Sequence, residues 1–227
     1  MEEMRYFERF SLSQRIQHIV LMTSFILLII TGMPVLFAES PASRAVVQSM
    51  GGMTVRAALH RVAALMLIGV CVYHAFYVLY SRRGRDDFGE MIPGVKDIKD
   101  MIGMLRYYIG LSMQKPRFGR FNFIEKFEYL AMGWGSFVMV LTGLILWFED
   151  QAMMVLPKWL MDVTTIVHSY EAVLAFLAIV IWHLYHVHLN PEVFPMSKVW
   201  LTGRISEHEL KERHPLEYEK IVGRTED

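Results

Sequence analysis

Histidines are unusually frequent in the apolar parts of this 227-residue sequence. Seven of the nine lie in apolar stretches: His18, His60, His74, His168, His183, His186 and His188. Ionisable side chains are costly inside a bilayer and usually mark function. A single such histidine could instead hydrogen-bond between helices or contact lipid headgroups. That alternative explains the whole set poorly, because the spacing is regular.

The spacing of four histidines indicates the chemistry. His60 and His74 are 14 positions apart. On a helix they would therefore lie within about 40° of each other around the axis and about 21 Å apart along it. His168 and His183 are 15 apart, a mismatch of about 60° that a slight bend or a one-residue bulge would absorb. Two facing helices would then supply two stacked bis-histidine sites. Iron porphyrin suits such sites better than zinc, which prefers four ligands close together.

The elements that must position these histidines are apolar and long. The predicted membrane-spanning helices cover residues 16–37, 57–80, 129–148 and 163–189. Each reaches the ~20 residues that cross a ~30 Å hydrocarbon core. We therefore predict an all-α integral membrane protein, a four-transmembrane-helix bundle with a cytoplasmic loop and a helical C-terminal tail. This composition excludes an ordinary soluble enzyme.

Two charged residues, Arg61 and Glu171, fall inside the apolar stretches. They could pair with each other, or Arg61 could hold a haem propionate. Glu171 could orient an imidazole or carry protons, although solvation at the interface explains it equally well. The one cysteine, Cys71, excludes a disulfide framework, a cysteine-ligated iron–sulfur cluster and a covalent CxxCH haem within the chain.

Basic residues predict the topology. Segment 81–126 carries ten Lys and Arg, against two in 38–56 and one in 149–162. Positively charged loops stay in the cytoplasm, so we expect a multi-pass protein of the bacterial inner membrane with both termini cytoplasmic. The charge-alternating tail predicts a division into a membrane domain, 1–190, and a cytoplasmic helical extension, 191–227, with His208 and His214 in solvent.

The first half of the chain resembles the second. Phe25–Phe37 is similar to Phe137–Phe148, and His60–Tyr77 is similar to His168–Tyr185. The repeat predicts quasi-equivalent pairs of helices and makes His74 the counterpart of His183.

These residues also resemble a known family, the cytochrome b (gamma) subunit of respiratory formate dehydrogenase and related b561-type di-haem membrane cytochromes. The similarity covers nearly the whole chain and is carried by Arg15–His18, Thr31-Gly32, Leu59-His60, Asn122–Lys126, Thr142-Gly143, Ile166–His168, the His183 region and His214-Pro215.

The resemblance implies two haems b. It assigns His60 and His168 to the outer haem and His18 and His183 to the inner one. The chain departs from the family in two ways: the ligand spacing on the fourth predicted span, 163–189, is one residue longer, and His74 replaces an apolar residue. Either His74 replaces His18, or one of the two packs beside the haem or faces quinone.

A third haem that uses His186 or His188 as a ligand is a further alternative, and both residues could otherwise pack around the inner haem. The resemblance also places Asn122, Glu125 and Lys126 near a quinone pocket, with a menaquinone-type quinone as the expected occupant.

The expected function is that of a membrane-anchoring electron-transfer subunit of a respiratory oxidoreductase complex. Electrons would pass between a periplasmic iron–sulfur or multihaem cytochrome subunit, itself joined to a catalytic subunit, and the quinone pool. The reverse direction, quinol oxidation, is equally compatible with the sequence, as is a quinone reductase or quinol dehydrogenase activity of the complex. A non-redox membrane anchor is the competing class, and a haem spectrum separates the two. Nothing in the sequence predicts nucleic-acid binding.

Overall fold

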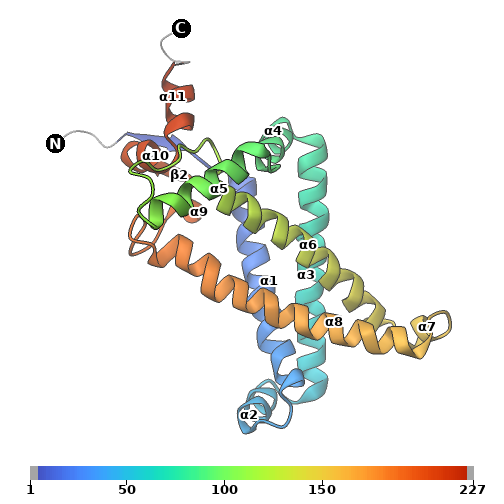
Figure 1. The fold of residues 1–227 in the computed structure, drawn as a ribbon. Coiled ribbons are helices and arrows are strands. Elements are labelled where there is room, and N and C mark those ends of the chain that lie inside the picture. Colours follow the sequence, from blue (N-terminus) through green and yellow to red (C-terminus); the bar gives the residue numbers. More distant parts are fainter. Residues whose placement is uncertain (1–4, 224–227) are drawn as a thin grey trace. The chain divides into compact units, whose positions relative to one another are not determined.

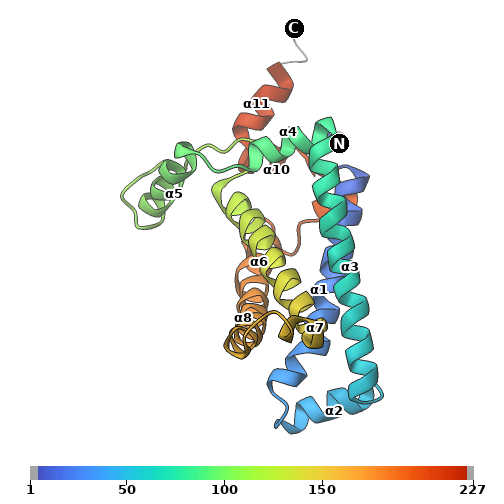
Figure 2. The same cartoon turned by 90° about the vertical axis from the view of Figure 1, so that its right-hand side faces the viewer.

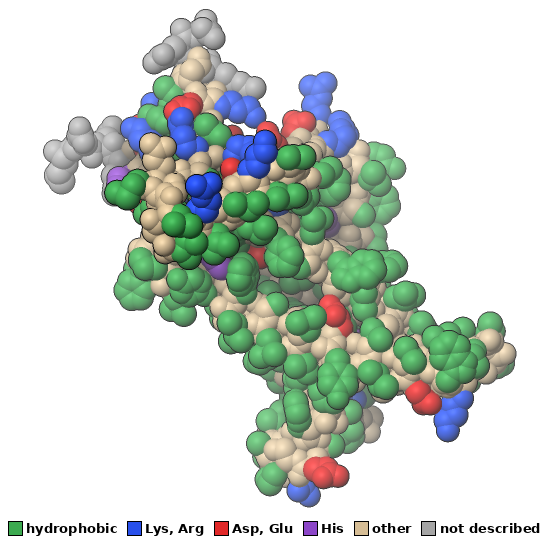
Figure 3. Space-filling view, viewed as in Figure 1, with side chains coloured by type: hydrophobic (Ala, Val, Ile, Leu, Met, Phe, Trp, Pro, Cys, Tyr) green, Lys and Arg blue, Asp and Glu red, His purple; other side chains and the backbone are tan. Residues whose placement is uncertain are grey.

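The computed structural model describes residues 5–223, and four helices in that range are long and apolar enough to cross a membrane (Figure 1). These are α1 (Leu12–Leu36), α3 (Met53–Tyr80), α6 (Phe123–Trp147) and α8 (Lys158–Leu177), the last continued by two π-helical segments, η1 (Ala178–His183) and η2 (Tyr185–Leu189). Hydrophobic side chains line much of the surface of these helices (Figure 3). The predicted four-helix membrane fold is confirmed.

Each long helix begins four to six residues before the apolar stretch that predicted it. The start of α6 shows why: it begins at Phe123 instead of residue 129 because Asn122 and Glu125 cap it. The Glu125 N–H donates to Asn122 Oδ1 at 2.9 Å, and the Asn122 N–H donates to Glu125 Oε2 at 2.8 Å. This reciprocal capping box satisfies two backbone donors and adds a polar first turn to the helix.

Shorter elements join the long helices. They are β1 (Tyr6–Glu8), α2 (Pro41–Ser49), α4 (Arg82–Met91), α5 (Val95–Tyr108), α7 (Glu149–Met153), α9 (Val199–Thr202), β2 (Arg204–Ser206), α10 (Glu207–Arg213) and α11 (Pro215–Gly223).

The chain forms two compact units. One unit, called here the helical unit, comprises residues 16–75 and 132–197. Within it α1 lies beside α3 and α6 beside α8 (Figures 1 and 2), as the hydrogen bonds described below require. The predicted pairing of helices from the two sequence repeats is therefore present.

The other unit, called here the polar unit, comprises residues 1–15, 76–131 and 198–227. In its described part β1 and β2 pair in antiparallel fashion, with Tyr6 opposite Ser206. A small core of Val199, Ile205 and Leu210 lies beneath them. The tail is helical as expected, but the predicted boundary at residue 190 differs from that of the units, because the tail packs with the N-terminal segment.

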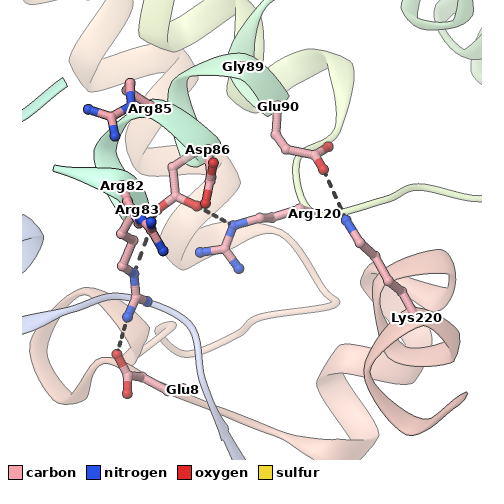
Figure 4. A pocket seen from close by; sticks show the side chains of 10 residues that line it. Glu8, Arg82, Arg83, Arg85, Asp86, Gly89, Glu90, Arg120 and Lys220 are labelled. Atoms are coloured by element: carbon pink, nitrogen blue, oxygen red, sulfur yellow. Dashed lines mark hydrogen bonds and ion pairs between the residues drawn. The ribbon is translucent and has the colours of Figure 1, made fainter. Parts of the chain in front are cut away.

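Ion pairs hold the polar unit together. Arg120 lies between two carboxylates, 2.7 Å from Asp87 and 3.4 Å from Glu217. A charged pocket nearby contains the pair of Arg83 with Glu8 and, at its other side, the pair of Lys220 with Glu90 (Figure 4). Several of the basic residues that predicted the topology therefore also have partners within this unit.

Candidate functional site

His60 and His168 occupy matching environments in the two halves of the helical unit. The imidazole Nδ1 of His60 lies 2.8 Å from Oγ1 of Thr31 on α1. The Nδ1 of His168 lies 2.9 Å from Oγ1 of Thr142 on α6. The internal repeat therefore extends to the hydrogen bonds that orient these two rings.

The threonine hydroxyls identify the tautomer of both histidines. Thr31 Oγ1 lies 2.6 Å from the carbonyl oxygen of Leu27, and Thr142 Oγ1 lies 2.7 Å from that of Val138. Each hydroxyl has one hydrogen, which it donates to that carbonyl, so it accepts from the histidine Nδ1–H. The neutral imidazole then carries its lone pair on Nε2, the atom that a metal ligand needs.

Glycines let each ring lie against the facing helix. A Cβ at Gly32 would lie 3.3 Å from a ring carbon of His60, and a Cβ at Gly143 would lie 3.2 Å from the equivalent carbon of His168. Both distances are tighter than ordinary van der Waals contact. The two Thr-Gly pairs thus orient an imidazole and make room for it.

His18 and His183 face each other at a distance that fits one metal ion. Their ring centroids are 6.4 Å apart. Two imidazoles bound on opposite sides of one ion, with metal–nitrogen bonds of about 2 Å, have ring centres about 6 Å apart. The pairing of His18 with His183 is the one that the family resemblance implied. It fits a bis-histidine iron.

A π-helix accommodates the 15-residue spacing on the fourth span. Segment η1 (Ala178–His183) lies between His168 and His183. A π-turn holds one residue more than an α-turn, so it absorbs one extra position. The one-residue bulge that the spacing predicted is therefore present.

His74 lies against α1, as His60 does. Its Nδ1 donates to Oε1 of Gln17 at 2.7 Å. Thr31 follows Gln17 by fourteen positions, and His74 follows His60 by fourteen positions. α1 therefore presents one polar acceptor to each histidine of α3, and the acceptor for His74, Gln17, directly precedes His18 in the sequence.

The remaining residues predicted near a haem have other contacts. The guanidinium of Arg61 lies over the Trp147 ring, 5.4 Å from its centroid. A Cβ at Gly135 would lie 3.0 Å from Oε1 of Glu171, so this carboxylate contacts α6. His186 Nδ1 donates to the Trp182 carbonyl at 2.8 Å.

His188 Nδ1 is buried and has no hydrogen-bond partner among the described residues. Arg61 thus lies over an aromatic ring and Glu171 lies against α6, whereas the sequence left open whether these two residues pair with each other.

The three predicted quinone-site residues are in the polar unit and have structural partners. Asn122 and Glu125 form the cap of α6, and Lys126 lies 3.0 Å from Asp97. Burial acts to raise the pKa of Asp97, but hydrogen bonds from the Gly94 N–H and the Lys126 ammonium bring it below its usual value. Any role in quinone binding would be additional to these roles.

His208 and His214 were both predicted to be in solvent, and the two differ. The His208 side chain is 90% exposed, as predicted. The prediction for His214 is wrong, since it is 1% exposed. Its Nδ1 donates to the Gly119 carbonyl at 2.9 Å, and its Nε2 faces Arg9 at 3.4 Å and Glu125 at 3.9 Å. Three segments far apart in the sequence bury it, which periodicity alone does not reveal.

Burial lowers the pKa of His214 from 6.5 to about 4; Arg9 lowers it further, while Glu125 raises it. Because the folded pKa is depressed, the stability contributed by the neutral ring is present above pH 6.5 and is lost as the pH falls towards 4. We expect the polar unit to lose up to about 3 kcal/mol over that interval.

Hydrogen exchange of β2 amides against pH measures this loss. His214→Gln, which keeps a hydrogen-bonding amide without a titrating group, should flatten the dependence on pH. An equally steep profile in that variant would assign the effect to carboxylates instead.

Residues 95–195 match the family model of prokaryotic cytochrome b561. The match supports a b561-type membrane cytochrome, and it spans α6, α8 and the π-helical segments, which carry His168 and His183. A comparison with curated proteins finds no match. The b561-type family implies binding of haem b, and the neutral, oriented imidazoles of the helical unit fit that cofactor.

Replacing Thr142 by valine is expected to weaken haem retention about tenfold or more, because the outer-sphere hydrogen bond that orients His168 is lost while shape is kept. Haem transfer to excess apomyoglobin measures the retention. Thr164→Val is the matched control, since Thr164 is a buried threonine of α8 whose Oγ1 donates to the Leu160 carbonyl at 2.8 Å. Equal haem loss from both variants would contradict an orienting role.

Proposed function

We propose that this chain is the membrane-anchoring b-type cytochrome subunit of a respiratory oxidoreductase complex, which transfers electrons between a periplasmic redox subunit and membrane quinone. One observation carries the proposal: the helical unit holds two sets of imidazoles, His60 and His168 with oriented Nδ1 atoms, and His18 facing His183 at 6.4 Å. A helix-packing role alone does not require a matching orientation in both halves.

The residues of the chain would act by fixing ligands and excluding water. Thr31 and Thr142 hold Nδ1–H of their histidines, so that Nε2 would bind iron. Gly32 and Gly143 keep the imidazoles close to the neighbouring helices. Haem b, when bound, supplies a one-electron iron couple.

His18 and His183 are the proposed inner ligands, and His60 and His168 the proposed outer ligands. His74, held by Gln17, is proposed to lie beside the inner site without ligating iron. The proposed cytoplasmic termini follow from the excess of basic residues in segment 81–126.

Optical spectroscopy of the purified chain tests the cytochrome proposal. A reduced-minus-oxidised spectrum should contain a b-type band, and a pyridine haemochromogen assay should give two haems per chain. Adding a menaquinol analogue should reduce the haem in the absence of any partner. Protein that is folded, helical and colourless would overturn the proposal and favour a non-redox anchor.

The proposed quinone site at Asn122–Lys126 needs variants that keep the helix cap. Asn122→Asp and Glu125→Gln both retain good capping residues, but one removes an amide donor and the other a carboxylate. We expect quinone turnover to fall several-fold while both haem spectra stay intact. Asn122→Ala, which removes the cap and destabilises the helix start by about 1 kcal/mol, controls for a structural effect. Unchanged turnover in the conservative pair would remove the site from this segment.

A further inference from the structure

Helix α5 of the polar unit presents a large apolar face to its surroundings. Its outward residues are Val95, Ile98, Met101, Ile102, Leu105 and Tyr108, each between 50% and 71% exposed. Figure 3 shows hydrophobic side chains along this part of the surface, with Lys and Arg side chains beside them. Contiguous apolar patches of this kind mark interaction sites.

Residues outside this apolar face attach α5 to the polar unit. Asp97 pairs with Lys126 at 3.0 Å, and Met104 is buried. A Cβ at Gly103 would lie 3.0 Å from Pro116, so the helix packs closely against the following loop. These contacts fix the rotation of α5 about its axis and leave the apolar face outward.

Two cations border the apolar face. At about 100° per residue, the outward apolar residues span an arc of about 140°, and Lys99 and Arg106 lie about 20–40° beyond its edge at Val95. Both are exposed. Long basic side chains at the edge of an apolar stripe can lay their stems along hydrocarbon and extend their charges to phosphate.

The chain connects α5 closely to the predicted spans. Fourteen residues separate Tyr80, the last of α3, from Val95, and fourteen separate Tyr108 from Phe123, the first of α6. Ten of the first fourteen form α4, which shortens that connection further. Each connection thus joins α5 to one end of a membrane-spanning helix, so α5 is tethered on both sides to the bilayer surface.

From this arrangement we infer that α5 is an interfacial helix, with its apolar face between lipid headgroups and acyl chains and with Lys99 and Arg106 at anionic phosphates. The charge of its surroundings agrees with that partner: residues 81–122 contain nine Lys and Arg against five Asp and Glu. The inference requires membrane insertion but is independent of haem and quinone.

Depth-dependent fluorescence tests it on the full chain in nanodiscs. With Cys71→Ser as background, an NBD probe is placed at Ile102→Cys on α5, at Glu212→Cys on α10 and at Leu65→Cys on α3. Acyl-brominated lipids should quench the probe at position 102 about threefold more strongly than at 212, and less than at 65. In anionic nanodiscs, Lys99→Glu with Arg106→Glu should reduce quenching at 102 towards that at 212.

Equal, weak quenching at 102 and 212, with strong quenching at 65, would overturn the inference, because α5 would then be in water or reserved for a protein. The haem spectrum of the same samples reports separately on the proposed function. A colourless protein with strong quenching at 102 would overturn the cytochrome proposal and leave the interfacial helix in place.

Discussion

Replacing His168 by alanine is expected to remove one of two haem equivalents from the purified chain. The reason is that this ring presents Nε2, with Nδ1–H held by Thr142, and that alanine offers no iron ligand. A pyridine haemochromogen assay per mole of protein measures the loss. His60→Ala should remove the same component of the spectrum, since His60 is held in the same way by Thr31.

The double variant of His60 and His168 sharpens this test. If both bind one haem, the double variant loses no more haem than either single variant, because ligands of one ion act as a unit. His208→Ala is the control, since this exposed histidine lies in the polar unit. Full haem content in either single variant would refute the assignment.

Replacing His183 by alanine is expected to remove the other haem equivalent. His183 is the residue on which the internal repeat and the family resemblance agree, and it faces His18 with 6.4 Å between ring centroids. His186→Ala is a matched control on the next π-helical segment, where the ring is held by the Trp182 carbonyl. Retention of both b-type signals without His183 would show that the inner site is built differently.

The same experiment distinguishes His18 from His74. His18→Ala should abolish the signal that His183→Ala abolishes, whereas His74→Ala should keep two haems and alter only the environment of the inner one. The opposite result would establish the pairing given by the repeat. A third spectral component that disappears with His186 or His188 would establish the additional haem.

Much of the membrane architecture could be predicted because hydrophobicity is local. The four spans follow from apolar stretches that together contain only two charged residues, Arg61 and Glu171. The ends of the helices could not be predicted from hydrophobicity, because capping hydrogen bonds determine them. For example, α6 begins where Asn122 and Glu125 exchange hydrogen bonds. Hydropathy marks the part of a helix in lipid, whereas hydrogen bonding sets its length.

The orienting residues of the candidate site were missed by sequence reasoning. Thr31 and Thr142 were recognised only as family motifs, and Gln17 was not singled out. A signal was present, since Thr-Gly occurs in both repeats at equivalent positions. The contact of each threonine with a histidine more than 25 residues away depends on helix packing.

The burial of His214 could not be predicted for a similar reason. Its surroundings come from Arg9, Gly119 and Glu125, which are distant from it in the sequence. The alternating charges of the tail predicted a solvated helix, and the outer face of α10 is indeed exposed to solvent. Its inner face, with Leu210 1% exposed, completes a core with the N-terminal strand.

The pairing of β1 with β2 imposes an order on biogenesis. Residues 6–8 are made first, and their partners 204–206 are made roughly 200 residues later, about 10–40 seconds at the usual rate of translation. All four spans are synthesised in that interval, so the polar unit closes last. Arg9 is 3% exposed in the folded protein. Its side chain therefore stays in water until His214 has been synthesised and packs against it. A chain terminated before residue 204 would expose an unpaired strand edge and an incomplete core, both of which quality-control proteases recognise.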